Sequence, residues 1–401
     1  MDSRTAPART AVAPYAAFAV TSRAATEALG PALLLAALAS ARPESDGALV
    51  VAGFTGLAAL SGPFVGALLD RVARPGVVIG LATGTLVVVM VGMALLIPHA
   101  ALGILVGAAA VGGFAHPALT GGLTSLLPSV VRPDALDRAY AVDAATYNIG
   151  AIVGPPLAAA MVVLGSTGPV VFTGALLLVA LLVLPRVPFA QREASTPPPP
   201  LLAQLTTGFA GLASTRPLAW TTFVTTLGFA GQAAFLVAVP LVTLEQTGSL
   251  AASGLVFGAA AVGGVLATLW LARRPLRHPD RAIAVTTAGV GLALAVLAFS
   301  PAFPVTLAAA FALGACDGPM LTAMFRIRTR EAAPAIRSQV FTTAASLRTS
   351  VYAATTAVLG LVVALGPTVL LLIGCGLHVL ALGAGTLIRR PPPPSPEPST
   401  T

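Results

Sequence analysis

Long apolar segments alternate with short polar ones along most of the 401-residue chain. A membrane-spanning helix needs about 20 apolar residues. The segments that satisfy this length are residues 14–39, 48–69, 76–97, 101–127, 139–163, 169–185, 217–243, 249–271, 282–299, 305–325, 339–363 and 368–388. Glycine and proline recur inside them, which membrane helices tolerate. The pattern predicts an all-α membrane protein with twelve transmembrane helices.

Composition supports lipid as the main solvent of this chain. Charged residues make up 9% of it and hydrophobic residues 56%, whereas soluble domains carry about 25% charged residues. A chain so poor in charge cannot cover a water-exposed surface. The first apolar segment is too long for a cleavable signal peptide and contains Arg23 and Glu27, so none is expected.

Arginines are distributed unevenly between the loops, and the chain contains no lysine. The loops 40–47, 98–100, 164–168, 244–248, 300–304 and 364–367 contain a single arginine, Arg42. The other loop arginines lie in the alternate loops and in the two terminal segments. The positive-inside rule then predicts both termini in the cytoplasm and a multi-pass protein of the plasma membrane.

The longest loop divides the predicted helices into two groups of six. It contains a proline run, 197–200, which is typical of a stiff linker, and then residues 201–213, which favour a short helix on the membrane surface. The proline-rich tail is expected to be disordered. The predicted parts are a cytoplasmic segment 1–13, a six-helix bundle 14–185, a central loop 186–216, a second six-helix bundle 217–388 and a tail 389–401.

An internal repeat supports this division. When the chain is shifted by about half its length, the small residues of 47–69 fall on those of 248–270, including Gly47 on Gly248, Gly53 on Gly254 and Gly62 on Gly263. Small residues recurring on one helix face allow close helix packing. Two parallel repeats related by an axis along the membrane normal are a known plan for transporters.

A short charged hinge joins the second and third segments. It reads Gly66-Ala-Leu-Leu-Asp70-Arg71-Val-Ala-Arg74 and resembles the signature loop between helices 2 and 3 of the major facilitator superfamily. The resemblance implies that Gly66, Asp70, Arg71 and Arg74 form a conformational latch. The alternative is a solvated loop that only fixes topology.

The fifth segment contains Gly150-Ala-Ile-Val-Gly154-Pro155-Pro156. This is similar to the antiporter motif of the same superfamily, which is typical of its exporters. Gly150, Gly154 and Pro155 favour close packing and a weak point in the helix. Across 14–388 the chain resembles the drug:proton antiporters of the family, which implies a proton-coupled carrier that alternates between inward-open and outward-open states.

Two ionisable residues one helical turn apart, Arg23 and Glu27, lie in the first segment. At 1.5 Å per residue they lie ~13 Å and ~20 Å deep, where charges are costly unless paired or hydrated. We expect both to face a central cavity. Glu27 would carry a proton or bind a cation, with Arg23 tuning it; the alternative is a buried structural ion pair.

Two further titratable groups, Asp317 and His116, occupy nearly equivalent places in the two halves. Asp317 lies ~20 Å deep in the tenth segment. A proton relay between the halves would use such a pair. The alternative for His116 is a hydrogen-bonded packing residue.

Arg348 lies at mid-depth in the eleventh segment and falls on Asn148 of the fifth under the repeat. It requires an acid, and Glu27 and Asp317 are both available. Arg348 would anchor a substrate carboxylate or exchange partners during transport; the alternative is a fixed ion pair.

Three other polar residues complete the candidate set. Asp143 is only ~6 Å into the fifth segment, so we expect it to be hydrated and consider it a possible coupling residue. Gln232 and Tyr147 could line the cavity.

The sequence indicates no enzyme, cofactor or metal site. The histidines have no partner at metal-ligand spacing, and no glycine-rich phosphate loop is followed by a lysine. The basic residues form no continuous face for nucleic acid. The expected partners are a small-molecule substrate, protons and membrane lipid, and the protein is expected to be monomeric.

The first hypothesis is proton-coupled efflux of a small, largely apolar organic compound such as a drug or natural product. Aromatic residues are only 5% of the chain, too few for a sugar carrier that stacks its substrate. The alternatives are an importer or exchanger of a small carboxylate or other metabolite, and a non-transporting membrane enzyme or sensor on the same fold.

Overall fold

A computed structural model describes residues 12–389, apart from 132–135, 190–200, 274–275 and 334–335. The described part is helical, without strands. The helices of the first half are α1 (Val12–Ala39), α2 (Glu44–Arg71), α3 (Pro75–Leu96), α4 (Leu102–Pro117), α5 (Leu123–Ser125), α6 (Leu127–Val130), α7 (Leu136–Ala160) and α8 (Gly168–Val183). Those that follow are α9 (Leu201–Ala213), α10 (Arg216–Thr247), α11 (Ser253–Arg273), α12 (Pro279–Ala298), α13 (Phe303–Glu331), α14 (Arg337–Leu361) and α15 (Pro367–Arg389).

Short non-α turns extend several of these helices. A π-helical turn, Ala118–Gly122, follows Pro117 and links α4 to α5, as expected where proline removes a backbone hydrogen bond. The 3₁₀ turns are Met161–Leu164, Leu184–Arg186, Leu250–Ala252 and Val363–Leu365.

Ten helices of the described chain are long and apolar enough to cross a membrane. α1 and α14 are as long as the others, with 28 and 25 residues, but are not among the ten. Their sequences explain this, because α1 carries Arg23 and Glu27 and α14 carries Arg348 with many hydroxyl residues. Polar side chains therefore lower the hydropathy of both segments that carry a candidate arginine.

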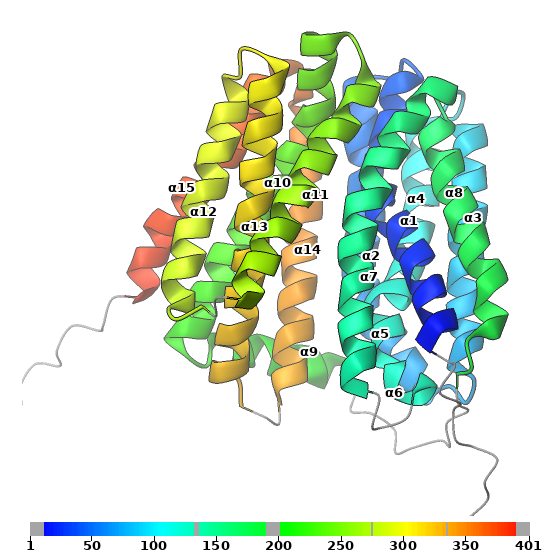
Figure 1. Ribbon diagram of the computed structural model, residues 1–401, viewed down its shortest axis with the longest axis vertical. Helices are drawn as coiled ribbons and strands as arrows, with labels where there is room; N and C mark the ends of the chain where they lie inside the picture. The colour runs from blue at the N-terminus through cyan, green and yellow to red at the C-terminus, as the bar shows by residue number, and fades with distance from the viewer. Residues whose placement is uncertain (1–11, 132–135, 190–200, 274–275, 334–335, 390–401) are drawn as a thin grey trace, which may run out of the picture.

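The helices form two bundles that stand side by side, α1–α8 and α10–α15 (Figure 1). Equivalent helices pair in each: α1 packs on α7 as α10 packs on α14, and α2 packs on α4 as α11 packs on α13. Between the bundles, α2 packs against α14 and α7 against α11. The repeat seen in the sequence is therefore present as a repeat of helix packing.

Glycines permit the closest approaches in both bundles. A Cβ on Gly113 of α4 would overlap the backbone carbonyl of Phe54 on α2, and one on Gly314 of α13 would overlap that of Ala260 on α11. Such contacts bring helix backbones together and contribute packing energy where lipid offers little hydrophobic driving force.

The short helix predicted in the central loop forms over residues 201–213. It lies below and between the two bundles in Figure 1 and packs on the start of α14, where Gly211 contacts Val340 and Ile336. The proline run and both terminal segments fall outside the described residues.

Arg42, the exceptional arginine, holds the end of the first bundle together. Its Nε donates to Asp46 at 2.8 Å, and its Nη1 donates to the carbonyl oxygens of Ile97 and Ala100 at 2.9 and 3.0 Å. These bonds fasten the α1–α2 loop to the end of α3. The structural role explains a cation on the side where arginine is otherwise absent.

The structure corrects the extent of the tenth segment. We expected it to end at 325 and the next arginines to lie in a loop, but α13 continues to Glu331. Arg328 is consequently in the helix and only 2% exposed.

Candidate functional site

A buried ion pair joins α1 to α7 in the first bundle. Arg23 Nη2 lies 2.8 Å from Asp143 Oδ1, and the two side chains are 0% and 4% exposed. Tyr15 donates to the same carboxylate oxygen, and Thr124 donates to the other at 2.9 Å. Both oxygens of Asp143 are therefore hydrogen-bonded. The prediction that Asp143 is hydrated is wrong, because depth along its own helix does not reveal that α1 covers it.

Acceptors surround the two terminal nitrogens of Arg23, whereas its Nε is buried without a described hydrogen-bond partner. Nη1 donates to the Asp143 carbonyl at 2.6 Å and to Thr146, and Nη2 donates to Thr124 at 2.8 Å. The ring of Tyr147 lies beneath it, with 3.6 Å from the guanidinium carbon to the ring centre. Arg23 does not face an open cavity, and this cluster fixes α1, α5 and α7 to one another.

The Gly150–Pro155 motif brings these helices together. A Cβ on Gly150 would press against the backbone of Arg23 and Ala24, and one on Gly154 would overlap the Ala24 carbonyl. The predicted close packing is therefore present. α7 continues through Pro155 as far as Ala160.

Glu27 lies one turn beyond Arg23 but is not paired with it, because Arg23 is paired with Asp143. Glu27 is half-buried, and within the described residues its carboxylate has no hydrogen bond or ion pair. Gly30, three residues later and on the same face of α1, contacts Leu236 of α10 across the seam between the bundles. Glu27 therefore lies on the face of α1 that meets the other half.

In the second bundle, Asp317 of α13 accepts a hydrogen bond from the amide of Gln232 on α10. Both side chains are half-buried. This bond joins two of the residues expected to line the cavity.

Arg348 of α14 lies over the ring of Phe229 on α10, with 4.5 Å from the guanidinium carbon to the ring centre. Phe229 in turn packs on Tyr352, with ring centres 4.8 Å apart. Of the two acids expected as its partner, Asp317 is the one with which Arg348 interacts electrostatically. A fixed ion pair is not formed among the described side chains.

His116 contacts Phe54 of α2 edge-on, with ring centres 5.3 Å apart. The described residues give it no bond to an acid. This contact resembles the packing alternative, and the relay with Asp317 stays a prediction.

The remaining candidates cannot be compared with the structure in full. The side chains of Asp70, Arg71 and Asn148 lie outside the described part of the chain. Arg74 is exposed at the N-terminus of α3, and Gly66 has no neighbour within 4 Å of a Cβ built on it. The latch therefore stays a prediction.

Sequence reasoning missed several residues that the structure makes important, among them the rings of Phe229 and Tyr352 beside Arg348. Tyr15, Thr124 and Thr146 support the ion pair, but hydroxyl residues in apolar segments are common and gave no signal. Arg328 was assigned to a loop together with Arg326 and Arg330, because a run of alternate arginines is typical of a loop.

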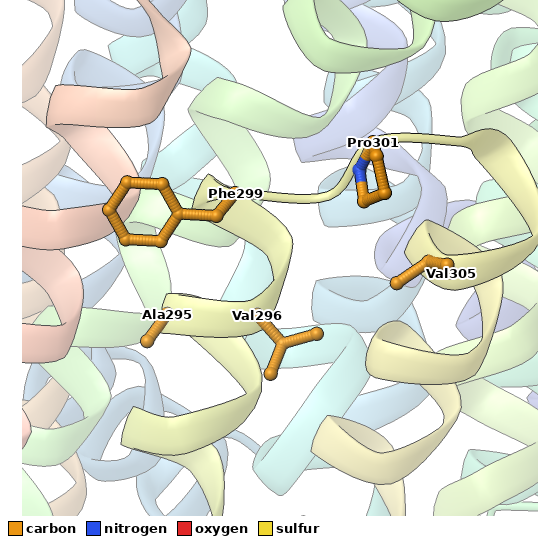
Figure 2. A pocket seen from close by; sticks show the side chains of 5 residues that line it. All are labelled: Ala295, Val296, Phe299, Pro301 and Val305. Atoms are coloured by element: carbon orange, nitrogen blue, oxygen red, sulfur yellow. The ribbon is translucent and has the colours of Figure 1, made fainter.

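Neither a metal centre in the described chain nor the pocket in Figure 2 adds a residue to this site. Within the described residues no three His, Cys, Asp or Glu side chains are grouped to hold a metal ion. A pocket of ≈ 390 Å³ lies at the ends of α12 and α13, lined by apolar side chains such as Phe299 and Val305 (Figure 2). Phe299 is 68% exposed, so this is an outer apolar groove, formed by other residues than the ionisable ones.

The paired bundles and their enclosed ionisable groups can be compared with known proteins. The family model of the Major Facilitator Superfamily matches residues 15–367. The chain belongs to the Major Facilitator Superfamily. It is an integral, multi-pass membrane protein with a transporter fold, and family membership favours a transporter over an enzyme.

Solved structures of this superfamily share the fold at low identity. The nucleoside transporter NupG, solved as a mutant, is 14% identical with a TM-score of 0.77, covering 94% of this chain and 100% of that one. The human organic anion transporter MFSD10 is 17% identical with a TM-score of 0.66, over 94% and 99%. A mutant of the peptide transporter POT is 13% identical with a TM-score of 0.73, covering 96% of this chain and 97% of that one. No curated protein matches the sequence.

Proposed function

We propose that this protein is a proton-coupled exporter of a small, largely apolar organic compound. The observation that carries the proposal is Glu27, a half-buried acid at the seam without a partner among the described residues. An acid can carry protons in a transport cycle only if no fixed cation holds it ionised. The nearest cation along α1, Arg23, is neutralised by Asp143.

The contacts between the bundles support alternating access. Gly360 of α14 packs on Ala48 of α2, and Gly254 of α11 packs on Pro156 of α7. All four residues lie toward the end predicted to be extracellular. Closure at this end is what an inward-facing carrier requires, and rocking about it would expose the seam to the other side.

We further propose that α1 and α14 also cross the membrane, which gives twelve spans with both termini in the cytoplasm. Asp70, Arg71 and Arg74 would then lie on the cytoplasmic side as a latch between α2 and α3. Asp317 would be a second coupling acid, because its only described hydrogen bond comes from the uncharged Gln232.

Import or exchange of a small carboxylate is the second candidate. Arg348 favours it, because its Nε is buried and has no hydrogen-bond partner in the described residues. An arginine in that condition could anchor an anionic group.

Everted membrane vesicles test the proposal. A pH gradient, acid inside, should drive accumulation of at least one of three fluorescent probes, neutral Nile red, anionic fluorescein and cationic rhodamine 6G. A protonophore and Glu27→Gln should each abolish the accumulation. Glu245→Gln, which changes an exposed acid of α10, should leave it unchanged. Transport that survives the protonophore or Glu27→Gln would contradict the proposal.

A further inference from the structure

Arg328 is a buried cation without a partner among the described residues. Its side chain is 2% exposed, and among the described residues its guanidinium has neither a hydrogen bond nor an ion pair. Its helical neighbours differ: Arg326 donates to the Leu276 carbonyl at 2.7 Å, and Arg330 pairs with Glu331 at 2.8 Å. An uncompensated buried charge is strongly unfavourable, so this position requires an explanation.

The orientation of the unpaired nitrogens is informative. The buried atoms without a partner are Nε and Nη2 of Arg328. These two nitrogens lie along one edge of the planar guanidinium, and that edge matches the two oxygens of a carboxylate.

Arg348 on the adjacent helix α14 shares this condition. Its Nε is also buried without a partner, and it interacts electrostatically with Arg328. Like charges in an apolar surrounding repel each other. The nearby acid, Asp317, already accepts a hydrogen bond from Gln232. An external anion between the two arginines would relieve the repulsion and satisfy the unpaired donors.

The surroundings indicate what the rest of this ligand would be. Met324, one turn before Arg328, belongs to a buried apolar cluster with Trp220 and Val224 of α10. Arg328 lies near the end of α13 that the arginine distribution predicts to be cytoplasmic. We infer that Arg328 and Arg348 bind the carboxylate of an amphipathic organic anion that enters from the cytoplasm. This inference rests on the proposed transport function and specifies its substrate class.

Ligand-dependent melting of the purified full-length protein tests the inference without protons or transport. Two matched pairs of probes are used, acetate with acetamide and 3-phenylpropanoate with 3-phenylpropanamide. Each acid should raise the melting temperature in a saturable way, because a ligand that binds only the folded state stabilises it. The amides should not, and 3-phenylpropanoate should bind more tightly than acetate.

Variants locate the site. Arg328→Gln and Arg348→Gln should each weaken 3-phenylpropanoate binding about tenfold or more, the usual effect of losing a charge-assisted hydrogen bond. Arg328→Lys keeps the charge but loses the two-nitrogen edge, and should weaken binding less. Arg326→Gln is the control, because Arg326 lies two residues away and points to Leu276, and it should bind as the wild type does.

Two results would overturn the inference: equal effects of acids and amides in both pairs, or an acid-specific shift that Arg328→Gln and Arg328→Lys both retain. If Arg328→Gln does not fold, the binding affinities of Arg328→Lys and Arg348→Gln still test whether the two arginines bind the carboxylate. Loss of anion binding with intact Glu27-dependent efflux would reject this site alone. Anion binding that is intact, in a protein without Glu27-dependent efflux, would reject proton coupling and support the site.

Discussion

The two halves of this transporter treat their buried arginines in opposite ways. In the first, Arg23 is bonded to a carboxylate, a carbonyl and two threonines and lies over an aromatic ring. In the second, Arg328 has no described partner. Arg348 lies over the ring of Phe229 and interacts electrostatically with Asp317. The arginine of the first half joins helices of its own bundle. These two arginines of the second half have donor atoms without a described partner.

The difference does not arise from the fold, because the helix pairs are equivalent. The cation of the first half lies on α1 and its ring, Tyr147, on α7. In the second half Arg348 lies on α14, the equivalent of α7, and Phe229 on α10, the equivalent of α1. Both halves therefore contain an arginine–aromatic contact between equivalent helices, but the helix that carries the arginine in one half carries the ring in the other. Side-chain placement alone therefore distinguishes the ion-paired arginine of the first half from Arg328 and Arg348 of the second, which have no described ion pair.

The largest effect is expected from removing the partner of Arg23. Asp143→Ala leaves a guanidinium buried without its counter-charge, which typically costs about 3–5 kcal/mol. The free energy of unfolding of the detergent-solubilised protein should fall by this amount. Arg23→Met combined with Asp143→Leu should recover part of the loss, since it removes both charges.

Asp280→Ala is the matched control. Asp280 also pairs with an arginine, Arg330, but their side chains are 31% and 49% exposed, and such pairs contribute about 0–1 kcal/mol. If Asp143→Ala costs no more than Asp280→Ala, the first half is not held together by its ion pair.

A smaller effect of opposite sign is expected in the second half. Arg328→Met removes a buried cation that nothing described compensates, so in the absence of carboxylates it should raise the free energy of unfolding by about 1 kcal/mol or more. Arg326→Met, at an exposed position of the same helix, should change it little. A loss of stability in Arg328→Met would mean that Arg328 has a structural partner, and the contrast between the halves would disappear.

Much of the fold could be predicted because lipid imposes a simple pattern. Residues 201–213 were expected to form a helix and do so, and the glycines of 150–154 were expected to pack closely and do so. The end of α13 was misplaced, because three arginines within five residues resemble a loop when only charge is considered.

The candidate site was harder to predict, because it depends on which helices face each other. Arg23, Glu27 and Asp143 were all selected, but their pairing was not. The i to i+4 spacing favoured Arg23 with Glu27, whereas the close α1–α7 packing brings Asp143 to Arg23. Arg348 left two possible acids, and only the arrangement of α10, α13 and α14 distinguishes Asp317.

The most direct test of the account asks which carboxyl group takes up a proton. Infrared difference spectra of the protein in lipid, recorded in H₂O and D₂O while the pH is lowered, should show a protonated carboxyl band. We expect Glu27→Gln to remove one component of that band, the rest coming from Asp317 and the exposed acids. Asp143→Asn should leave the band unchanged, because Asp143 is held by Arg23, Tyr15 and Thr124. A band that is unchanged in Glu27→Gln and loses a component in Asp143→Asn would contradict the account.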